Sequence, residues 1–584
     1  MPELNPALRA SEEALSKIKN CIDENICFRL EAGAGAGKTY SLIESLKYII
    51  KSRGKELLKS NQKVACITYT NIAKDEILER TDAHPVIFSD TIHAFCWSVI
   101  KNYPQKLKEL IPSIGKWQER IESSDFELEL QSVKYELGYP KLSEDEISIS
   151  HNDVVALMAL MLENPKFQKN LKSRFPVIFI DEYQDTDKEL ASAILINLIE
   201  NDSGTLVGFF GDHWQKIYGK SSCGLISSEQ NKIYEIGKEA NFRADKNLVH
   251  SLNRLRPELP QAEHNPGSQG NIKIFHTNSW MGERLNGGHW KGDLPAESVK
   301  QYLEITQELI SQDGWDLSPS KTKILFLTNN LIANEQSFSS LAACFKRNED
   351  YLKKENKYIK YLLEILLPSI VAFEKKDYGE LFEIISRKRP SLTCQNDKRK
   401  WVASYNQLLH SSEEGSIGDI LDILLETQIP VLPQAIHRDE KRYADLNALE
   451  SGDLTDEDKS FIDKLDKLRA VSFREVINLS EYVNLKTPFA TKHGVKGAEF
   501  DNVLVLFGRG WNQYNWNQML EWFADGIPSD KQDSYERNRN LFYVSCSRAK
   551  HNLTLLFTQE LSGSALNALE QIFGSENIFD IAAQ

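Results

Sequence analysis

The chain alternates short apolar runs with longer polar segments that have the periodicity of amphipathic helices. Apolar runs of about four to eight residues are typical of strands buried in a parallel sheet, and helices between such strands indicate an α/β fold. Four runs precede residue 245 and three follow residue 270, which predicts two α/β groups. The runs are Cys27–Gly33, Lys63–Thr70, Pro176–Glu182, Thr205–Asp212, Lys323–Thr328, Asn502–Phe507 and Asn552–Thr558.

The two groups are separated by a polar stretch rich in proline and glycine, Pro257–Gly270, which is typical of a linker. Two further stretches lack buried-strand runs and are predicted to be mainly helical insertions, one into each α/β group. The predicted organisation is a first α/β domain of residues 1–100 and 173–256 with the insertion 101–172, and a second of residues 271–332 and 476–584 with the insertion 333–475.

The composition is typical of a folded protein and indicates the cellular compartment in which it is found. Apolar residues make up 41% and charged residues 26% of the 584, which excludes a mostly disordered chain. No apolar run approaches the ~20 residues that span a bilayer, so no membrane partner is expected. Residues 1–27 have no apolar signal-peptide core, and the eight cysteines include no CxxC pair. This pattern predicts reduced thiols in a cytoplasmic protein.

Taken alone, the balance of charges argues against nucleic-acid binding. Acidic residues number 84 and basic residues 70, which gives a net charge of −14. Nucleic-acid binding depends on clustered lysines and arginines that neutralise phosphates. The motifs below reverse that first interpretation.

A glycine-rich loop between the first predicted strand and the following helix has the pattern of a phosphate-binding loop. Small residues let successive backbone N–H groups curl around phosphate, and the helix N-terminus adds the positive end of its dipole. Lys38 is predicted to reach the β- and γ-phosphates of ATP, and the Thr39 hydroxyl to hold Mg²⁺. The loop residues are Ala32, Gly33, Ala34, Gly35, Ala36, Gly37, Lys38 and Thr39.

A second predicted strand, Val177–Ile180, ends in two carboxylates, Asp181 and Glu182. Asp181 suits Mg²⁺ binding, and Glu182 suits a base that orients the attacking water. An apolar run followed by two acids is commonly just a strand end. Together with the phosphate-binding loop, it predicts a nucleoside triphosphatase.

At this point the chain resembles the UvrD/Rep-type superfamily 1 DNA helicases, whose signature Asp181–Thr186 (DEYQDT) matches. The resemblance extends in family order from the phosphate-binding loop to within about 35 residues of the last one. It implies two RecA-like domains with ATP between them. The other matching segments are Thr68–Asn71, Thr91–Phe95, Gly211–Tyr218, Asn241–Arg243, His493–Phe500 and Tyr543–Ala549.

The resemblance also implies roles for particular residues. Arg243 and Arg548 are the cations that stabilise charge on the γ-phosphate, and Gln215 senses that phosphate. Tyr40 and Phe242 stack on adenine, and Glu499 binds the ribose. The residues implied to face DNA are Thr68, Tyr69, Thr70, Asn71, His93, Trp214, Tyr218 and His493. For Trp214 a buried anchor at the sheet edge remains an equal alternative.

The chain departs from the family pattern in several places. Leu8 stands where the family has a glutamine that reads adenine, which puts strict ATP selectivity in question. Gly219 follows Tyr218 where the family has an arginine in a base-stacking tripeptide. Arg539 is followed by Asn540, where the family has paired arginines. The second insertion is modest, and little chain follows residue 549.

Two functions remain open, with a third less favoured. The first is an ATP-driven translocase or helicase on single-stranded DNA, of 3′→5′ polarity by the resemblance. The second is a DNA-end sensor that activates a partner nuclease. Short UvrD-like proteins of this kind resemble the bacterial helicase subunit of Gabija antiphage systems, which works beside an OLD-family nuclease. The third is an NTPase that remodels protein. In either DNA-binding case, the acidic surface predicts a weak, salt-sensitive grip on DNA.

Overall fold

The computed structural model describes residues 5–124, 128, 131–136, 140–217, 219, 221–385, 392–449, 454–510 and 513–583. These residues form two compact units, which are described separately. The first consists of Met1–Met281, Val495–Val503 and Gln513–Gln584, and the second of Gly282–Gly494 and Leu504–Asn512. In the described part of the chain, no helix is both long enough and apolar enough to cross a membrane.

The first unit contains a six-stranded parallel sheet in the order β3-β2-β7-β8-β1-β9. Four of its strands confirm predicted runs, whereas β3 and β9 were not predicted because their side chains mix polar and apolar types. The strands are β1 (Phe28–Ala32), β2 (Val64–Thr68), β3 (Ile87–Thr91), β7 (Val177–Asp181), β8 (Leu206–Gly211) and β9 (Tyr234–Lys238).

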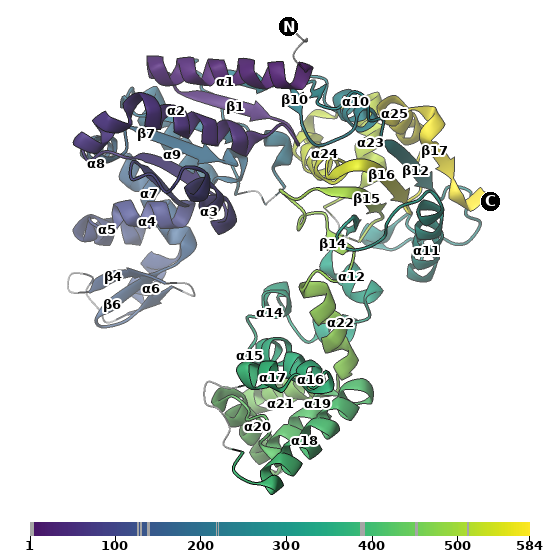
Figure 1. Cartoon of the computed structure of the whole chain (residues 1–584). Helices are drawn as coiled ribbons and strands as arrows, with labels where there is room; N and C mark the ends of the chain where they lie inside the picture. The colour runs from purple at the N-terminus through teal and green to yellow at the C-terminus, as the bar shows by residue number, and fades with distance from the viewer. Residues whose placement is uncertain are drawn as a thin grey trace. The chain divides into compact units, whose positions relative to one another are not determined.

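Helices cover both faces of this sheet (Figure 1). The helices α1 (Pro6–Glu24) and α2 (Lys38–Lys59) pack on one face, and α4 (Ile92–Ile100), α7 (His151–Leu162) and α9 (Lys188–Ile194) pack on the other. Alternating strand residues divide between the two cores, because successive side chains of a strand point to opposite faces. Phe179 and Phe210 belong to the α1/α2 core, and Phe209 to the other. The sheet is therefore sandwiched, as in other doubly covered parallel sheets.

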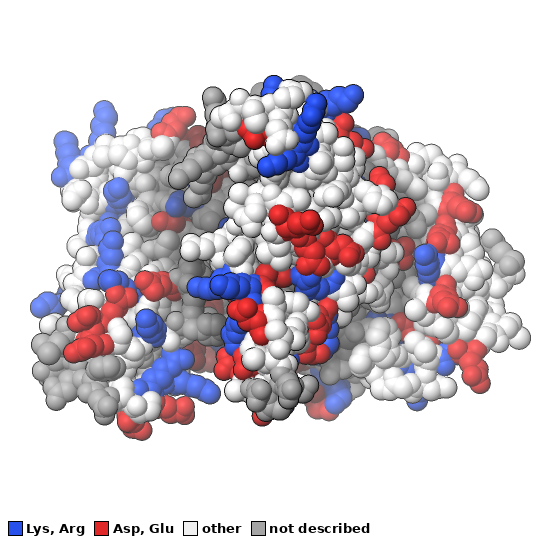
Figure 2. Space-filling model, turned by 90° about the horizontal axis from the view of Figure 1, so that it is seen from below, with Lys and Arg blue, Asp and Glu red and all other residues white. Residues whose placement is uncertain are grey.

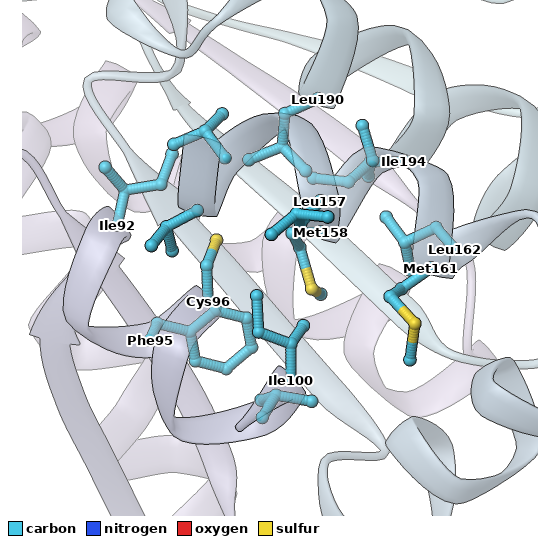
Figure 3. Close-up of a cluster of buried hydrophobic side chains, with 14 of the residues drawn as sticks. Ile92, Phe95, Cys96, Ile100, Leu157, Met158, Met161, Leu162, Leu190 and Ile194 are labelled. Atoms are coloured by element: carbon cyan, nitrogen blue, oxygen red, sulfur yellow. The ribbon is translucent and has the colours of Figure 1, made fainter. Parts of the chain in front are cut away.

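The segment predicted as the first insertion is mainly helical and also contains a small three-stranded sheet. Its strands are only two to four residues long, and β4 and β5 have no buried residue, so they lack the apolar runs by which buried strands are recognised. Figure 3 shows that α7 joins this segment to the core, with Leu157, Met158 and Met161 among side chains of α4 and α9. The elements are α5 (Pro104–Leu110), α6 (Trp117–Glu122), β4 (Ser132–Tyr135), β5 (Lys141–Leu142), β6 (Glu146–Ile149) and α8 (Pro165–Arg174).

Further strands and helices of the first unit come from both predicted α/β groups and from the predicted linker between them. Strand β12 pairs in parallel with both β16 and β17, and the predicted linker contributes β11, which pairs with β10. The elements are α3 (Asn71–Arg80), β10 (Ala240–Asn241), α10 (Lys246–Leu255), β11 (Ala262–Glu263), β12 (Asn271–His276), α23 (Trp516–Asp525), α24 (Gln532–Cys546), β16 (Ala549–Phe557), α25 (Gly563–Phe573) and β17 (Ile578–Asp580).

The second unit is mainly helical and includes the parallel pair β13 (Thr322–Phe326) and β14 (Phe489–Thr491). Strand β15 (Phe500–Phe507) contributes residues to both units. The helices are α11 (Ala296–Gln312), α12 (Asn329–Glu335), α13 (Ser339–Ala343), α14 (Asn348–Leu352), α15 (Lys357–Tyr361), α16 (Leu367–Glu374), α17 (Tyr378–Ile385), α18 (Gln395–Glu414), α19 (Ile417–Thr427), α20 (Gln434–Asn447), α21 (Asp456–Arg469) and α22 (Phe473–Val483). The predicted fold class, α/β with two RecA-like parts and mainly helical insertions, is confirmed.

A buried charged cluster links the carboxyl ends of β1 and β8. The Arg256 guanidinium donates to Asp212 Oδ1 at 2.7 Å and to Glu31 Oε1 at 3.3 Å, and its side chain is 2% exposed. Glu31 also accepts from the Tyr183 hydroxyl at 2.6 Å and from the backbone N–H of His213 at 2.9 Å. Burial raises the pKa of Glu31, but its hydrogen bonds and the nearby charges outweigh burial and bring the pKa down to about 2.

Close aromatic packing around Gly208 yields a test of the sheet core. A Cβ on Gly208 would lie 2.6 Å from Phe28 Cζ and 2.8 Å from Phe179 Cδ1. We expect Gly208→Ala to lower the free energy of unfolding by about 1–3 kcal/mol, because overpacking forces rings in a tight core to shift. Gly563→Ala, where a Cβ meets nothing within 4 Å, is the matched control and should change stability by less than about 0.5 kcal/mol. Denaturant titration measures both, and equal stabilities would contradict this packing.

The charged cluster predicts a pH-dependent contribution to stability. Because the pKa of Glu31 is lowered from 4.5 to about 2, its contribution is complete above pH 4.5 and disappears as pH falls towards 2. We expect Glu31→Gln to reduce the free energy of unfolding by about 2–4 kcal/mol at pH 7, with the difference narrowing below pH 4.5. Glu235→Gln removes the exposed carboxylate 3.0 Å from Arg29 and should cost less than about 1 kcal/mol. A pH-independent deficit in the Glu31 variant would overturn the assignment.

Candidate nucleotide-binding site

The predicted nucleotide-site motifs meet at one edge of the six-stranded sheet. The loop of residues 33–37 follows β1, and Asp181 is the last residue of β7 and pairs with Phe210 of β8, the strand between β7 and β1. Glu31 of β1 pairs in register with Gly211 of β8. The carboxyl ends of parallel strands lie at the same edge of a sheet. The loop after β1 and the acidic residues at the ends of β7 and β8 therefore lie close together at this edge.

The loop has the backbone conformation that curling around an anion requires. Gly35 and Gly37 have positive φ values of 76° and 74°, which residues with a Cβ rarely adopt. At Gly35 a Cβ would lie 2.8 Å from both Arg243 Cβ and Asn241 Oδ1. Helix α2 begins at Lys38, so its N-terminal N–H groups and dipole border the loop. The arrangement therefore fits a polyphosphate.

Three side chains hold Ala34 at the start of this loop. Its N–H donates to the Tyr543 hydroxyl at 3.0 Å, and its carbonyl accepts from the amides of Asn241 at 3.1 Å and Gln261 at 3.3 Å. Tyr543 lies in α24 and Gln261 in the stretch predicted to be a linker. Gln261 was therefore missed in the sequence, because nothing in its local pattern marks it as part of the site.

The paired carboxylates occupy different electrostatic environments. Asp181 is 7% exposed and its Oδ1 has no hydrogen-bond partner, and burial followed by the charge of Glu182 raises its pKa to about 7. Burial also raises the pKa of Glu182, but the charges of Lys38 and Lys496 and the Gln184 amide lower it overall. A buried carboxylate oxygen without a partner beside a second carboxylate fits a cation such as Mg²⁺.

Lys38 and Glu182 face each other across the site, with 3.9 Å between the ammonium and a carboxylate oxygen. Glu182 adopts a left-handed conformation with φ of 47°, which is uncommon for a residue with a side chain. Thr39, predicted to hold Mg²⁺, is half-buried in the first turn of α2. The structure thus brings the predicted phosphate and water ligands together.

Both predicted arginines converge on Ser547. Arg243 donates from Nη1 to the Ser547 carbonyl at 2.9 Å, and Arg548 donates from Nη2 to the Ser547 hydroxyl at 3.0 Å. Arg548 is 1% exposed, and burial together with the charge of Arg243 lowers its pKa to about 9. Arg243 pairs with Glu499 at 2.9 Å, and Glu499 also pairs with Lys550 at 3.1 Å. Glu499, expected to bind the ribose, is therefore held by two cations.

The residues expected to stack on the base lie close to one another. Tyr40 is 52% and Phe242 36% exposed, and the buried ammonium of Lys238 lies 5.6 Å from one ring centroid and 5.8 Å from the other. Phe242 also contacts the ring of His264. Two exposed rings around a common point suit stacking on a nucleobase. Lys238 carried no motif signal in the sequence.

Gln215 is tied into the charged cluster of Arg256. Its amide donates to Asp212 Oδ2 at 2.7 Å, while Asp212 Oδ1 accepts from Arg256. In α24, Asn540 donates to the backbone carbonyls of residues 213 and 216 at 3.2 and 3.1 Å. Asn540, noticed in the sequence only as a departure from the family pattern, thus connects α24 to the turn that carries Gln215.

Trp214 is buried, with 5% of its surface exposed. The Arg539 guanidinium lies 3.7 Å from the centroid of its ring, Arg256 lies 5.1 Å away, and Tyr543 meets it edge-on. This environment favours the anchor over the base-stacking role that was held equal to it. The placement of Tyr218, the other aromatic predicted to face DNA here, lies outside the described residues.

The segment from Thr68 to Asn71 occupies the same sheet edge as the nucleotide site. Thr68 is buried and donates to the Thr70 carbonyl at 3.1 Å, so its hydroxyl supports the turn. Thr70 caps α3 by accepting from the Ala73 N–H at 3.2 Å. Tyr69 is 47% exposed, and Asn71 is also exposed. Tyr69 and Asn71 are therefore the residues of this segment most available to a ligand.

The two predicted histidines are shielded from water to different degrees. His93, at the start of α4, packs against His151 with ring centroids 4.3 Å apart, and burial followed by the charge of His151 lowers its pKa to about 4. His493 belongs to the second unit, where burial and Lys492 lower its pKa to about 4. Both rings are neutral at pH 7, so they suit hydrogen bonding better than charge pairing with phosphate.

Comparisons with known proteins find similarity to ATPases and helicases. A family model described as an AAA domain matches residues 16–221. Gabija protein GajB of Bacillus cereus (strain HuB5-5) is 24% identical, and the match covers 97% of this chain and 98% of GajB. The ATP-dependent DNA helicase PcrA of Staphylococcus epidermidis is 24% identical over 51% of this chain and 45% of PcrA. PcrA of Staphylococcus aureus is 26% identical over 47% of this chain and 41% of PcrA.

Among solved structures, the crystal structure of Pif1 helicase from Candida albicans matches 58% of this chain and 54% of its own, at 13% identity and a TM-score of 0.28. The chain thus spans nearly all of GajB but less than half of PcrA. In its ordered motifs and the geometry of its phosphate-binding loop the chain resembles the UvrD-like superfamily 1 helicases, and along almost its whole length it is similar to the Gabija protein GajB.

Proposed function

We propose that this protein is a DNA-dependent ATPase that couples ATP hydrolysis to movement along, or unwinding of, single-stranded DNA. The observation that carries the proposal is the meeting of the phosphate-binding loop, Lys38 and Glu182 at one sheet edge, with 3.9 Å between the two side chains. An anion-binding loop beside a carboxylate that can orient water is what phosphoryl transfer to water requires.

In this proposal the loop N–H groups and Lys38 bind the β- and γ-phosphates, and Thr39 and Asp181 hold Mg²⁺. Bound Mg²⁺ supplies charge neutralisation on the phosphate oxygens. Glu182, ionised because its pKa is lowered, accepts a hydrogen bond from the attacking water and aligns it. Arg243 and Arg548 stabilise the charge that develops on the γ-phosphate.

In this proposal, ATP hydrolysis is coupled to DNA binding by residues that lie at the same edge of the sheet. Gln215 is bonded to Asp212, and Asp212 is bonded to Arg256, so the turn that would sense the γ-phosphate is fixed to the charged cluster. Tyr69 and Asn71 provide exposed contacts for a single strand at the end of β2. Such contacts hold bases and backbone without reading sequence.

The surface charge bears on how tightly DNA is held. On the face shown in Figure 2, acidic and basic side chains are interspersed. Together with the net charge of −14, this supports weak binding through a few polar groups and cations. We further propose 3′→5′ polarity, a cytoplasmic location, and two motor domains of residues 1–100 with 173–256 and 271–332 with 476–584, each with an insertion.

A second candidate function is a DNA-end-sensing ATPase subunit that activates a partner OLD-family nuclease in antiphage defence. The similarity to GajB over 97% of the chain favours it. The burial of Trp214 also favours it, because this residue then adds no stacking surface for a single strand. In this case ATP hydrolysis reports DNA ends instead of driving unwinding.

Substitutions at the hydrolytic pair test the proposed activity. We expect Lys38→Ala and Glu182→Gln each to lower DNA-stimulated ATPase activity by about 100-fold or more, because one removes a phosphate ligand and the other the group that orients water. Lys47→Ala, in the same helix with a side chain 51% exposed, is the matched control and should retain activity. Phosphate release in the presence and absence of single-stranded DNA measures the effect. Full activity in either site variant would refute the proposal.

Strand displacement by the chain alone separates the two candidate functions. Processive unwinding of a duplex with a single-stranded tail, without any added protein, supports the motor. DNA-stimulated ATPase activity with no unwinding supports the end sensor, and nuclease activation by the ATPase-active chain would then be measured directly. DNA-independent ATPase activity would contradict both candidates.

A further inference from the structure

A fully buried lysine lies directly behind the phosphate-binding loop. Lys238 is the last residue of the edge strand β9 and pairs in register with Ala32, at the end of β1. Its side chain is buried, with no exposed surface, and its ammonium donates to the Gly37 carbonyl at 3.0 Å and to the Ser41 hydroxyl at 2.8 Å. Lys238 therefore connects the edge of the sheet to the first turn of α2.

The contacts of Lys238 hold the end of the loop at Gly37, where the backbone adopts a conformation that favours glycine. Gly37 has φ of 74° and accepts two hydrogen bonds on its carbonyl, from Ser41 N–H at 3.2 Å and from Lys238. The rings of Tyr40 and Phe242 lie near the same ammonium, at 5.6 and 5.8 Å. One cation thus organises the end of the phosphate-binding loop and the ring pair proposed to bind the base.

The charge of Lys238 is not balanced by a carboxylate. Among the described residues no acidic side chain forms an ion pair with it, and burial followed by the charge of Lys38 lowers its pKa to about 8. Arg256 shows the contrast, since this equally buried cation contacts both Asp212 and Glu31. The positive end of the α2 dipole adds to the unfavourable environment of Lys238.

A buried cation without a counter-charge destabilises a folded protein, unless an anion binds nearby. The anion that this site is built to receive is the polyphosphate of a nucleotide, which would lie against the loop that Lys238 supports. Because Coulombic interactions are strong in a poorly solvated site, Lys238 can act on the phosphates through the loop without touching them.

We propose that Lys238 is a further cation of the nucleotide site, a positioning residue that holds Gly37 and Ser41 for phosphate binding and whose charge is compensated by the bound triphosphate. The inference rests on the proposed ATPase function. It predicts that Lys238 strengthens the binding of ATP more than that of AMP, because the compensating charge grows with the number of phosphates.

The decisive comparison is between nucleotide affinity and the stability of the free protein. In Lys238→Met, which removes the charge and keeps the length of the side chain, we expect binding of a non-hydrolysable ATP analogue with Mg²⁺ to weaken at least 10-fold. We expect AMP binding to change less, and the melting temperature without nucleotide to stay the same or rise. Lys47→Met is the control for loss of one exposed lysine of α2 and should change neither quantity.

A purely structural role gives a different result: the melting temperature without nucleotide falls, and ATP and AMP affinities fall by the same factor. That outcome, or unchanged ATP affinity, would overturn the proposal. If Lys38→Ala abolishes ATPase activity while Lys238→Met leaves ATP affinity intact, only the role of Lys238 fails. If Lys38→Ala retains full activity, the ATPase proposal itself fails.

The pH dependence of binding to the unaltered protein provides a test that does not depend on a variant folding. Lys38 is the charged group that acts on Lys238, and the other groups that contact its ammonium are the Gly37 carbonyl, the Ser41 hydroxyl and the rings of Tyr40 and Phe242. Since Lys238 is protonated below about pH 8 and loses its charge above it, affinity for the ATP analogue should fall between pH 7 and 9. Constant affinity over this range would also overturn the proposal.

Discussion

The pairing of Arg256 with Asp212 and Glu31 is the interaction on which the nucleotide-site edge depends. A buried guanidinium between two carboxylates is stable only when its donors and their acceptors are closely matched, so it fixes the ends of β1 and β8 relative to each other. The phosphate-binding loop starts from one of these strand ends, and the turn with Gln215 starts from the other. The geometry of both motifs therefore rests on a residue that belongs to neither.

Two kinds of buried cation lie around this cluster, and they have different roles. Arg256 is matched with carboxylates and stabilises the fold. Arg548 and Lys238 are buried without a paired carboxylate among the residues that the structure describes, and the pKa of each is lowered. Unmatched buried cations make a region of positive potential that favours anions, which is the property a triphosphate site needs. Positive charge is thus concentrated locally at this site although the net charge of the chain is −14.

The sequence predicted those parts of the fold whose signal lies within a short stretch of residues. Strands with uninterrupted apolar runs, such as β7 and β8, were found within one or two residues, and the phosphate-binding loop was found because its spacing depends on backbone geometry. Edge strands such as β9 were missed, because one side of an edge strand meets solvent and its apolar signal is weak. Long-range partners such as Gln261 and Lys238 were missed because their roles depend on which strands become neighbours, and residue spacing does not encode that.

The bond between Asn540 and the turn at Gln215 has a consequence for how the sequence can diverge. Asn540 donates only to backbone carbonyls, those of residues 213 and 216. Every amino acid carries such a carbonyl, so the attachment survives replacement of the side chain at Lys216. Substitutions in this turn can therefore change its side-chain chemistry, including what it offers to a bound strand, while its connection to α24 is kept, as long as Asn540 itself is retained.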